Sequence, residues 1–150
     1  MTDHIADILD GLVLFQDFSY PELKTISRFV THVAHKQGEV LFEEGDPGDT
    51  MLILAEGKLS IFKGGEHGTQ LLSHEGRGRM VGEMALLDNE RRSATCVADT
   101  DCEVLSLSLE GLSRMSRETP LLAYKFMFSL ARILSRRLRK TSGLLVDFLS

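Results

Sequence analysis

One stretch in the middle of the chain reads Gly82-Glu83-Met84-Ala85-Leu86-Leu87-Asp88-Asn89-Glu90-Arg91-Arg92-Ser93-Ala94-Thr95. It places a glycine and a carboxylate at one end, and a guanidinium with two hydroxyl side chains at the other. Small alanines stand beside both ends, and a short apolar run followed by a polar turn separates them. We interpret this stretch as a grip for a small anionic ligand that carries a sugar, and the rest of the chain as its scaffold.

Each end of the stretch suits one part of such a ligand. The carboxylate of Glu83 can accept two hydrogen bonds from ribose hydroxyls, and the guanidinium of Arg92 offers a planar fork to a phosphate. If residues 85–87 form a short helix, its N–H groups point toward the anion, and Gly82 lets the backbone approach the ligand closely. A strand-turn-strand with a surface Glu–Arg ion pair is the alternative, and composition alone favours it.

Two amphipathic helices are predicted before this stretch. Residues 3–12 repeat apolar side chains at helical spacing, and Ser19-Tyr20-Pro21-Glu22 is typical of a capping box with proline in the first turn. The buried face of the second helix is expected to consist of Leu23, Ile26, Val30 and Val33. His32 and His35 would lie on this helix, with no cysteine or acid beside them to complete a metal site.

The middle of the chain has the pattern of short strands. Apolar segments recur about ten residues apart and are separated by glycine-rich turns, which predicts an antiparallel sandwich or barrel rather than alternating strands and helices. The predicted strands are 40–42, 51–54, 59–62, 70–73, 80–81, 94–97 and 104–109. The last one alternates only in part with polar residues, so we expect a helix to cover one of its faces.

The helical period returns at Pro120. Apolar residues recur every four positions at Leu122, Phe126, Leu130, Leu134 and Leu138, which predicts an amphipathic helix of more than about twenty residues. Gly143 costs about 1 kcal/mol relative to alanine, so helix beyond it is less favoured. A second stripe has coiled-coil spacing and comprises Met127, Leu130, Leu134, Arg137, Thr141, Leu144 and Phe148. One of the two stripes is therefore expected to face another subunit.

Composition excludes several classes of function. The 150-residue chain has a net charge of −5, which does not favour nucleic acid or an anionic membrane, although residues 121–150 carry six basic side chains against one acidic. We expect a solvated helix face there, no bilayer span and no targeting segment. The two cysteines predict free buried thiols in a cytoplasmic protein. No nucleophile–base motif or metal set is present, so we expect no enzyme, no cofactor and no metal site.

The opening stretch also resembles a known motif. Gly-Glu-Met-Ala-Leu-Leu, followed by Arg-Ser-Ala-Thr ten residues after the glycine, is similar to the phosphate-binding cassette of the cyclic nucleotide-binding domain family. Residues 41–57 resemble the same family's earlier strand-turn-strand with its structural glycines. The resemblance implies a mainly β fold, an eight-stranded antiparallel β jelly roll with N-terminal helices and a long C-terminal helix. The expected boundaries are 1–36 for the N-terminal helices, 37–110 for the jelly roll and 111–150 for the C-terminal helices.

The resemblance further implies roles for individual residues. Glu83 would bind the ribose 2′-hydroxyl, Arg92 would pair with the cyclic phosphate, and Ser93 would touch phosphate or base. The remaining expected ligand contacts are Gly82, Met84, Ala85, Ala94, Leu72, Ser73, Arg137, Thr141 and Ser142. Thr141 and Ser142 match a Thr-Ser pair that contacts adenine in catabolite-activator-type regulators. The implied ligand is cAMP, with cGMP as the alternative, and the implied partner is a second copy of the chain, bound through the C-terminal helix.

Two departures from the family pattern leave alternatives open. Arg91 stands where many family members have proline, and we expect its side chain to face solvent. The activators continue into a helix-turn-helix, whereas this sequence stops at Ser150. We therefore expect a cyclic nucleotide sensor module without nucleic acid binding of its own. The alternatives are a ligand-free dimerisation domain and the truncated sensor part of a transcription regulator.

Overall fold

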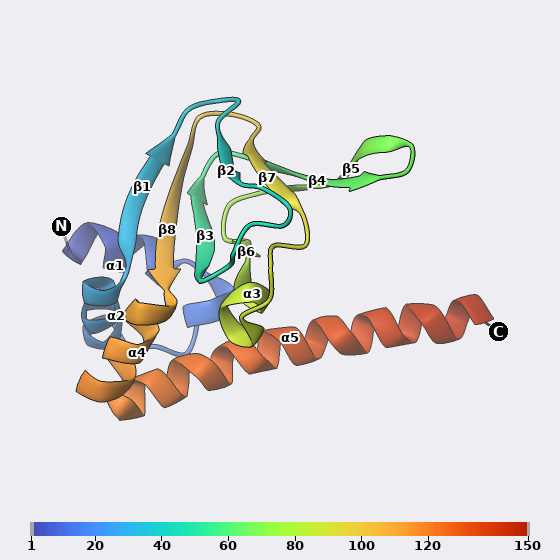
Figure 1. Ribbon diagram of the computed structural model, residues 1–150. Coiled ribbons are helices and arrows are strands. Elements are labelled where there is room, and N and C mark those ends of the chain that lie inside the picture. The colour runs from blue at the N-terminus through green and yellow to red at the C-terminus, as the bar shows by residue number, and fades with distance from the viewer. Residues whose placement is uncertain (1, 150) are drawn as a thin grey trace.

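The structure is a computed structural model that describes the backbone of residues 2–149 and the side chains of residues 4–143. Two four-stranded sheets stand above a layer of helices, and one long helix runs beneath them (Figure 1). The helices are α1 (Thr2–Asp10), η1 (Val13–Phe15), α2 (Tyr20–Ile26), η2 (Ser27–Phe29), α3 (Glu83–Asp88), α4 (Leu109–Glu118) and α5 (Pro120–Leu149). The strands are β1 (Thr31–His35), β2 (Val40–Phe42), β3 (Thr50–Glu56), β4 (Leu59–Gly65), β5 (Gly68–Glu75), β6 (Met80–Val81), β7 (Thr95–Ala98) and β8 (Cys102–Ser108).

All strand pairs are antiparallel. One sheet has the order β1-β8-β3-β6 and the other β2-β7-β4-β5, so chain neighbours often lie in different sheets. This arrangement confirms the predicted eight-stranded jelly roll, with helices before it and a long helix after it. The β4–β5 hairpin extends beyond the rest of its sheet and projects from the body (Figure 1).

The second N-terminal helix is shorter than its apolar pattern predicted. The capping box is confirmed: Glu22 N donates to Ser19 Oγ at 3.3 Å, and Ser19 N donates to Glu22 Oε1 at 2.8 Å. The helix ends at Ile26, however, and Val30 is already extended (φ −111°, ψ 149°). The prediction of helix through residue 36 was therefore wrong, because residues 31–35 form β1 and supply the eighth strand.

Long-range pairing explains this difference. Val33 pairs with Val104 of β8, and β-branched side chains fit a pleated surface better than a helix. The two histidines expected on a helix lie on β1 instead. His32 Nε2 is 3.3 Å from Glu103 of β8, and His35 pairs with Glu39.

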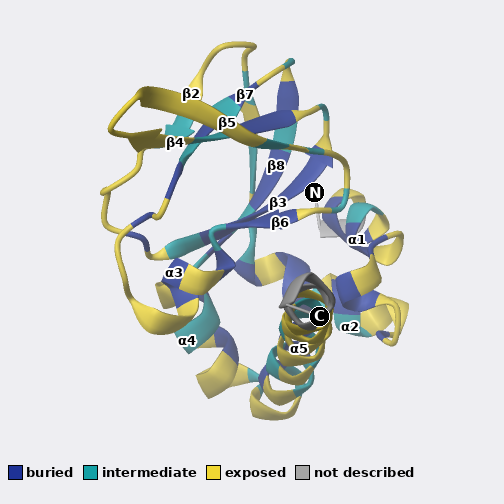
Figure 2. Cartoon of the chain, turned by 90° about the vertical axis from the view of Figure 1, so that its right-hand side faces the viewer, coloured by how far each residue is buried: buried dark blue, intermediate teal, exposed yellow. Residues whose placement is uncertain are grey.

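Two apolar cores share strands β3 and β8. Met51 and Ile53 of β3 pack toward the helices, whereas Leu52 and Leu54 pack between the two sheets. The neighbouring strand β8 divides its apolar residues in the same way, and Figure 2 shows these strands buried at the centre. The prediction that helices cover one face of residues 104–109 is therefore confirmed.

Helix α5 confirms the long C-terminal helix and continues through Gly143. Phe126 and Leu130 are buried in the helical core, and Phe126 stacks on Phe15 of η1 with ring centroids 5.9 Å apart. Farther along, Leu138 is 68% exposed, and the helix extends past the body (Figure 1). Within the described residues, no helix is long and apolar enough to cross a bilayer.

Candidate functional site

Helix α3 and its two flanks form the centre of the candidate site. The expected short helix is present and starts at Glu83, after Gly82 in a left-handed conformation (φ 78°). A Cβ at Gly82 would collide with Arg92 Nη1, and a Cβ at Gly48 would collide with the side chain of Ala85. Both glycines are therefore required for close packing around α3.

Backbone hydrogen bonds join the two sequence signatures. Gly45 N donates to Arg92 O at 2.8 Å, and Arg92 N donates to Asp46 O at 2.8 Å. The earlier glycine-rich turn thus fixes the backbone of Arg92. This contact explains why the two motifs occur together although they are far apart in the sequence, since residues 45 and 46 of the first bond to residue 92 of the second.

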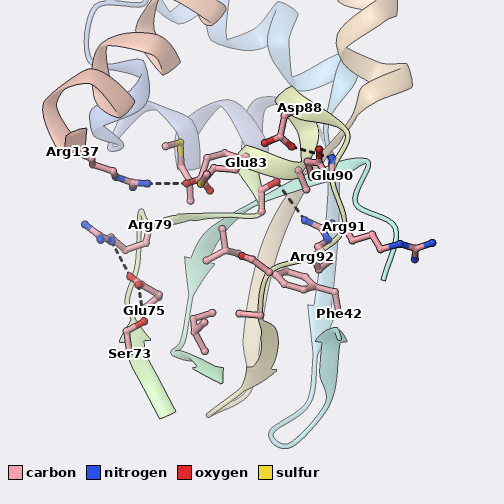
Figure 3. A pocket seen from close by; sticks show the side chains of 18 residues that line it. Phe42, Ser73, Glu75, Arg79, Glu83, Asp88, Glu90, Arg91, Arg92 and Arg137 are labelled. Atoms are coloured by element: carbon pink, nitrogen blue, oxygen red, sulfur yellow. Dashed lines mark hydrogen bonds and ion pairs between the residues drawn. The ribbon is translucent and has the colours of Figure 1, made fainter. Parts of the chain in front are cut away.

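A cavity of about 390 Å³ opens beside α3 (Figure 3). Residues of β2, β4, β5, β6, the loop before β7 and α5 line it. Nine of the predicted ligand contacts line it, namely Gly82, Glu83, Met84, Ala85, Arg92, Ser93, Ala94, Ser73 and Arg137. The other lining residues are Phe42, Ile61, Glu75, Arg79, Met80, Val81, Asp88, Glu90 and Arg91. The structure therefore brings together residues that lie up to 95 positions apart in the sequence, from Phe42 to Arg137.

Arg92 is the most constrained side chain of the cavity. It is only 8% exposed, and its Nη2 donates to Thr50 O at 2.7 Å while Nη1 donates to Gly82 O at 3.4 Å. Its guanidinium carbon lies 4.2 Å from the centre of the Phe42 ring. Burial lowers the pKa of Arg92, and the nearby carboxylates of Asp49 and Asp46 oppose that shift.

One donor of this guanidinium has no partner. Arg92 Nε is buried and makes no hydrogen bond to any described residue. Buried polar groups are nearly always satisfied by protein, water or a ligand. An arginine at a cavity wall with an unused buried donor is suited to hold an anion.

Glu83 lies at the other end of the cavity and is 8% exposed. Its Oε1 accepts a hydrogen bond from Arg137 Nη1 of α5 at 2.9 Å (Figure 3). A carboxylate oxygen has room for more than one donor, so this pair leaves acceptor capacity for a hydroxyl group. The same contact ties α5 directly to α3.

A cluster of three polar side chains on β5 and the turn after it also lines the cavity. Ser73 Oγ donates to Glu75 Oε1 at 3.1 Å, and Arg79 Nε donates to Glu75 Oε2 at 2.9 Å. Ser73 was a predicted ligand contact, whereas Glu75 and Arg79 were not predicted. Their four-residue spacing around two glycines was the available signal, and it was interpreted only as a turn.

Three predicted contacts do not line the cavity. Leu72 is 56% exposed, because it points to the face of β5 opposite to Ser73. Thr141 and Ser142 are exposed on α5, and Thr141 Oγ1 donates to Arg137 O at 3.0 Å.

Arg91 is exposed, as expected, and its Nη1 donates to Gly45 O at 2.8 Å, pointing away from Arg92 (Figure 3).

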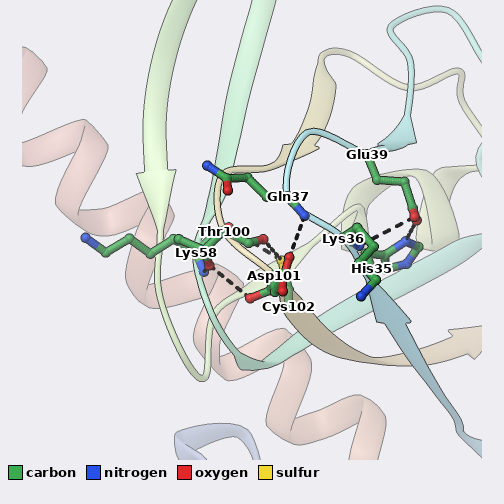
Figure 4. Close-up of polar contacts among 8 residues, drawn as sticks. All are labelled: His35, Lys36, Gln37, Glu39, Lys58, Thr100, Asp101 and Cys102. Carbon is green, nitrogen blue, oxygen red and sulfur yellow. Dashed lines mark hydrogen bonds and ion pairs between the residues drawn. The ribbon is translucent and has the colours of Figure 1, made fainter.

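Both cysteines are free and buried, as predicted. Burial raises the pKa of Cys96 to about 12 and also raises that of Cys102. The Cys102 thiol donates to Thr100 O at 3.1 Å and lies in a network of loop contacts (Figure 4). Protonated buried thiols are poor nucleophiles, which argues against redox sensing at these positions. Among the described residues, no group of three or more His, Cys, Asp or Glu side chains could hold a metal ion.

The chain is similar to proteins of known function. It is 35% identical over 145 residues to the "Cyclic AMP receptor protein" of Thermus thermophilus, which covers 95% of this chain and 64% of that protein. It is 34% identical over 107 residues to the "cAMP-dependent protein kinase regulatory subunit" of Aspergillus niger, covering 71% of this chain and 26% of that protein. The chain therefore spans less than two thirds of the length of either relative.

Solved structures show the same similarity. A cyclic nucleotide-binding domain from Methylobacillus flagellatus superposes with a TM-score of 0.83 at 29% identity, covering 97% of this chain and 83% of that one. The sequence profile described as "Cyclic nucleotide-binding domain" matches residues 32–119, more than half of the chain. Together with the cavity and the jelly roll, these matches show that the chain belongs to the cyclic nucleotide-binding domain family.

Proposed function

We propose that this chain is a regulatory sensor that binds cAMP in the cavity beside α3 and signals occupancy through α5. The relatives support cAMP as the ligand, because the Thermus protein and the Aspergillus subunit are both named for it. The exposed hydroxyl of Ser93 does not distinguish adenine from guanine, so cGMP is the alternative ligand. The two free thiols fit a cytoplasmic location.

The observation that carries this proposal is the unpartnered buried Nε of Arg92 at the wall of the cavity. A cyclic phosphate would supply the missing acceptor and compensate the buried positive charge. The side chain is already fixed by Thr50 O, Gly82 O and the Phe42 ring. Little conformational entropy would therefore be lost when the phosphate binds.

Glu83 supports the ribose-binding part of the proposed site. Its buried carboxylate lies at the opposite end of α3 from the loop that carries Arg92, and it has acceptor capacity for the ribose 2′-hydroxyl. The backbone at Gly82, Met84 and Ala85 would line the ring between the two. We assign no catalytic residue, because these groups bind and orient a ligand rather than activate a nucleophile.

The contact between Glu83 and Arg137 gives a route from the cavity to α5. A ribose hydroxyl on Glu83 shares the carboxylate with Arg137 and changes the strength of that ion pair. Occupancy would then favour one position of α5 over another, which is the requirement for any signal. We propose that this helix couples the ligand to a second copy of the chain, through residues 121–148.

Calorimetry on the purified chain with cAMP, cGMP and cyclic dinucleotides tests the proposal. We expect saturable binding of cAMP with one site per chain, and weaker or absent binding of cyclic dinucleotides, which exceed one nucleotide in size. A thermal-shift measurement on the same panel checks that binding stabilises the fold. If no cyclic nucleotide binds, the chain is better explained as a dimerisation domain with an empty cavity.

A further inference from the structure

A second cavity of about 430 Å³ lies between the N-terminal turn at η1, the turn before β6, and α5. Its lining residues are Gly11, Leu12, Val13, Leu14, Arg77, Gly78, Arg79, Met80, Ile133, Arg136 and Arg137. Four of them are arginines and none is acidic. Arg79, Met80 and Arg137 also line the first cavity, so the two cavities share a wall.

Within residues 4–143, two of the four arginines have an acidic partner. Arg79 pairs with Glu75 and Arg137 pairs with Glu83, each at 2.9 Å. Arg77 and Arg136 make no ion pair or hydrogen bond with any residue whose side chain is described. Arg77 and Arg136 are exposed and have no competing carboxylate in the cavity lining, so an anion of charge −2 or more can pair with both guanidinium groups.

The C-terminal end of α1 offsets the positive charge of Arg77 only in part. A Cβ at Gly11 would lie 3.7 Å from Arg77 Nη2, so the guanidinium lies beside the end of this helix. The negative end of a helix carries the equivalent of only about half a charge. Arg136 has no such neighbour among the residues that line the cavity.

The rest of the lining is aliphatic. Leu12, Leu14 and Met80 are 5%, 3% and 5% exposed and form the floor together with Ile133. No aromatic side chain is among the described residues that line this cavity, so it offers no surface on which a nucleobase could stack. A floor of this kind favours a hydrocarbon chain, and arginine forks favour a phosphate group.

We propose that this second cavity binds an aliphatic phosphate or diphosphate. The phosphate group contacts Arg77 and Arg136, and the hydrocarbon chain covers the floor of Leu12, Leu14, Met80 and Ile133. This site is separate from the proposed cyclic nucleotide site and does not depend on it. Its ligand lacks a sugar and a base, and its two principal arginines do not line the first cavity.

Calorimetry with geranyl diphosphate, kept below its critical micelle concentration, tests the proposal on the whole chain. We expect saturable binding that Arg77→Gln and Arg136→Gln each weaken by about tenfold, the loss of one charge-assisted hydrogen bond. Both side chains are exposed, so the variants should fold normally, and cAMP binding provides a check on the first cavity. Arg139→Gln removes the same charge from α5 at a position that lines neither cavity, and it should leave binding unchanged.

Two further ligands identify the chemistry that is recognised. Pyrophosphate should bind more weakly than geranyl diphosphate because it lacks the chain, and octanoate should bind more weakly because it lacks the phosphate. The proposal is overturned if the wild type shows no saturable binding. It is also overturned if Arg139→Gln weakens binding as much as Arg136→Gln, which would indicate non-specific attraction. If Arg92→Ala weakens geranyl diphosphate binding while Arg77→Gln does not, the anion occupies the first cavity instead.

Discussion

Arg92 combines two roles that usually belong to different residues. Its backbone joins two turns, and its side chain is buried with one unused donor. Burying a guanidinium without full compensation costs free energy, so such a residue normally has a functional reason. The Phe42 ring and the carbonyl oxygens of Thr50 and Gly82 offset part of this cost.

Replacing Arg92 with alanine should weaken cAMP binding by about 2–3 kcal/mol, because a charge-assisted hydrogen bond to the phosphate is lost. Calorimetry measures the effect as a change of about 30- to 150-fold in Kd. Arg91→Ala is the comparison: the Arg91 side chain also lines the cavity, but its guanidinium bonds to Gly45 O, so its loss should weaken cAMP binding less. Equal affinities for wild type and Arg92→Ala would exclude the phosphate contact.

Gly82 is required by the same guanidinium. Gly82→Ala should destabilise the fold by about 2 kcal/mol or more, because alanine is strained at φ 78° and its Cβ would collide with Arg92 Nη1. Gly143→Ala in α5 is the control, since open space surrounds that position and alanine favours a helix there by about 1 kcal/mol. Chemical denaturation of the two variants should show opposite shifts. A neutral Gly82→Ala would show that the turn before α3 can relax.

At the level of elements, apolar and polar contacts hold α5 to the body at different places along the helix. Its first half packs in the apolar core through Ala123, Phe126 and Leu130. Beyond that core its specific contact with the site is the ion pair between Arg137 and Glu83. The apolar contact fixes the helix, whereas the polar contact can respond to a ligand.

Arg137→Gln should therefore loosen α5 near the cavity without unfolding the protein. The ion pair is partly exposed, so its loss should cost only about 1 kcal/mol of local stability. Hydrogen exchange measured by mass spectrometry should be faster around residues 134–143 in the free variant. The change in exchange that cAMP causes in this segment should be smaller than in the wild type.

Arg139→Gln provides the comparison for this measurement, because that side chain is exposed on the same helix and lines neither cavity. A cAMP-dependent change of the same size in Arg137→Gln and wild type would show that α5 senses the ligand through another contact.

For the whole molecule, the elements that depend on local sequence patterns were predicted better than those that depend on long-range pairing. Seven strands, the capping box and the long helix followed from periodicity and turn residues in the sequence. The eighth strand did not, because Val30 and Val33 continue the helical spacing of Leu23 and Ile26, and only the pairing of residues 31–35 with β8 makes Val33 extended. Glu75 and Arg79 were missed for a similar reason, since only the fold places them opposite α3.

The second stripe of α5 shows the same limit. Leu130 belongs to both predicted stripes and lies in the chain's own core, so the stripe as a whole is not free for a partner. Leu144 and Phe148 of that stripe lie outside the residues whose side chains are described. Among the residues of α5 whose side chains are described, the exposed large apolar ones are Leu121, Tyr124, Phe128 and Leu138. Their spacing places them on one face of the helix, and this face is the better candidate for a dimer contact.

If two copies associate through that face, Leu138→Asp should weaken self-association by about tenfold or more, because a symmetric interface loses the apolar side chain twice and gains two charges. Leu138 is 68% exposed in the single chain, so the thermal stability of the monomer should change little. Lys140→Asp introduces the same side chain two positions away, on roughly the opposite side of the helix, and should leave association intact. Sedimentation velocity over a range of protein concentrations separates the two variants. Equal weakening by both, or none by Leu138→Asp, would place the dimer contact elsewhere than on this face of α5.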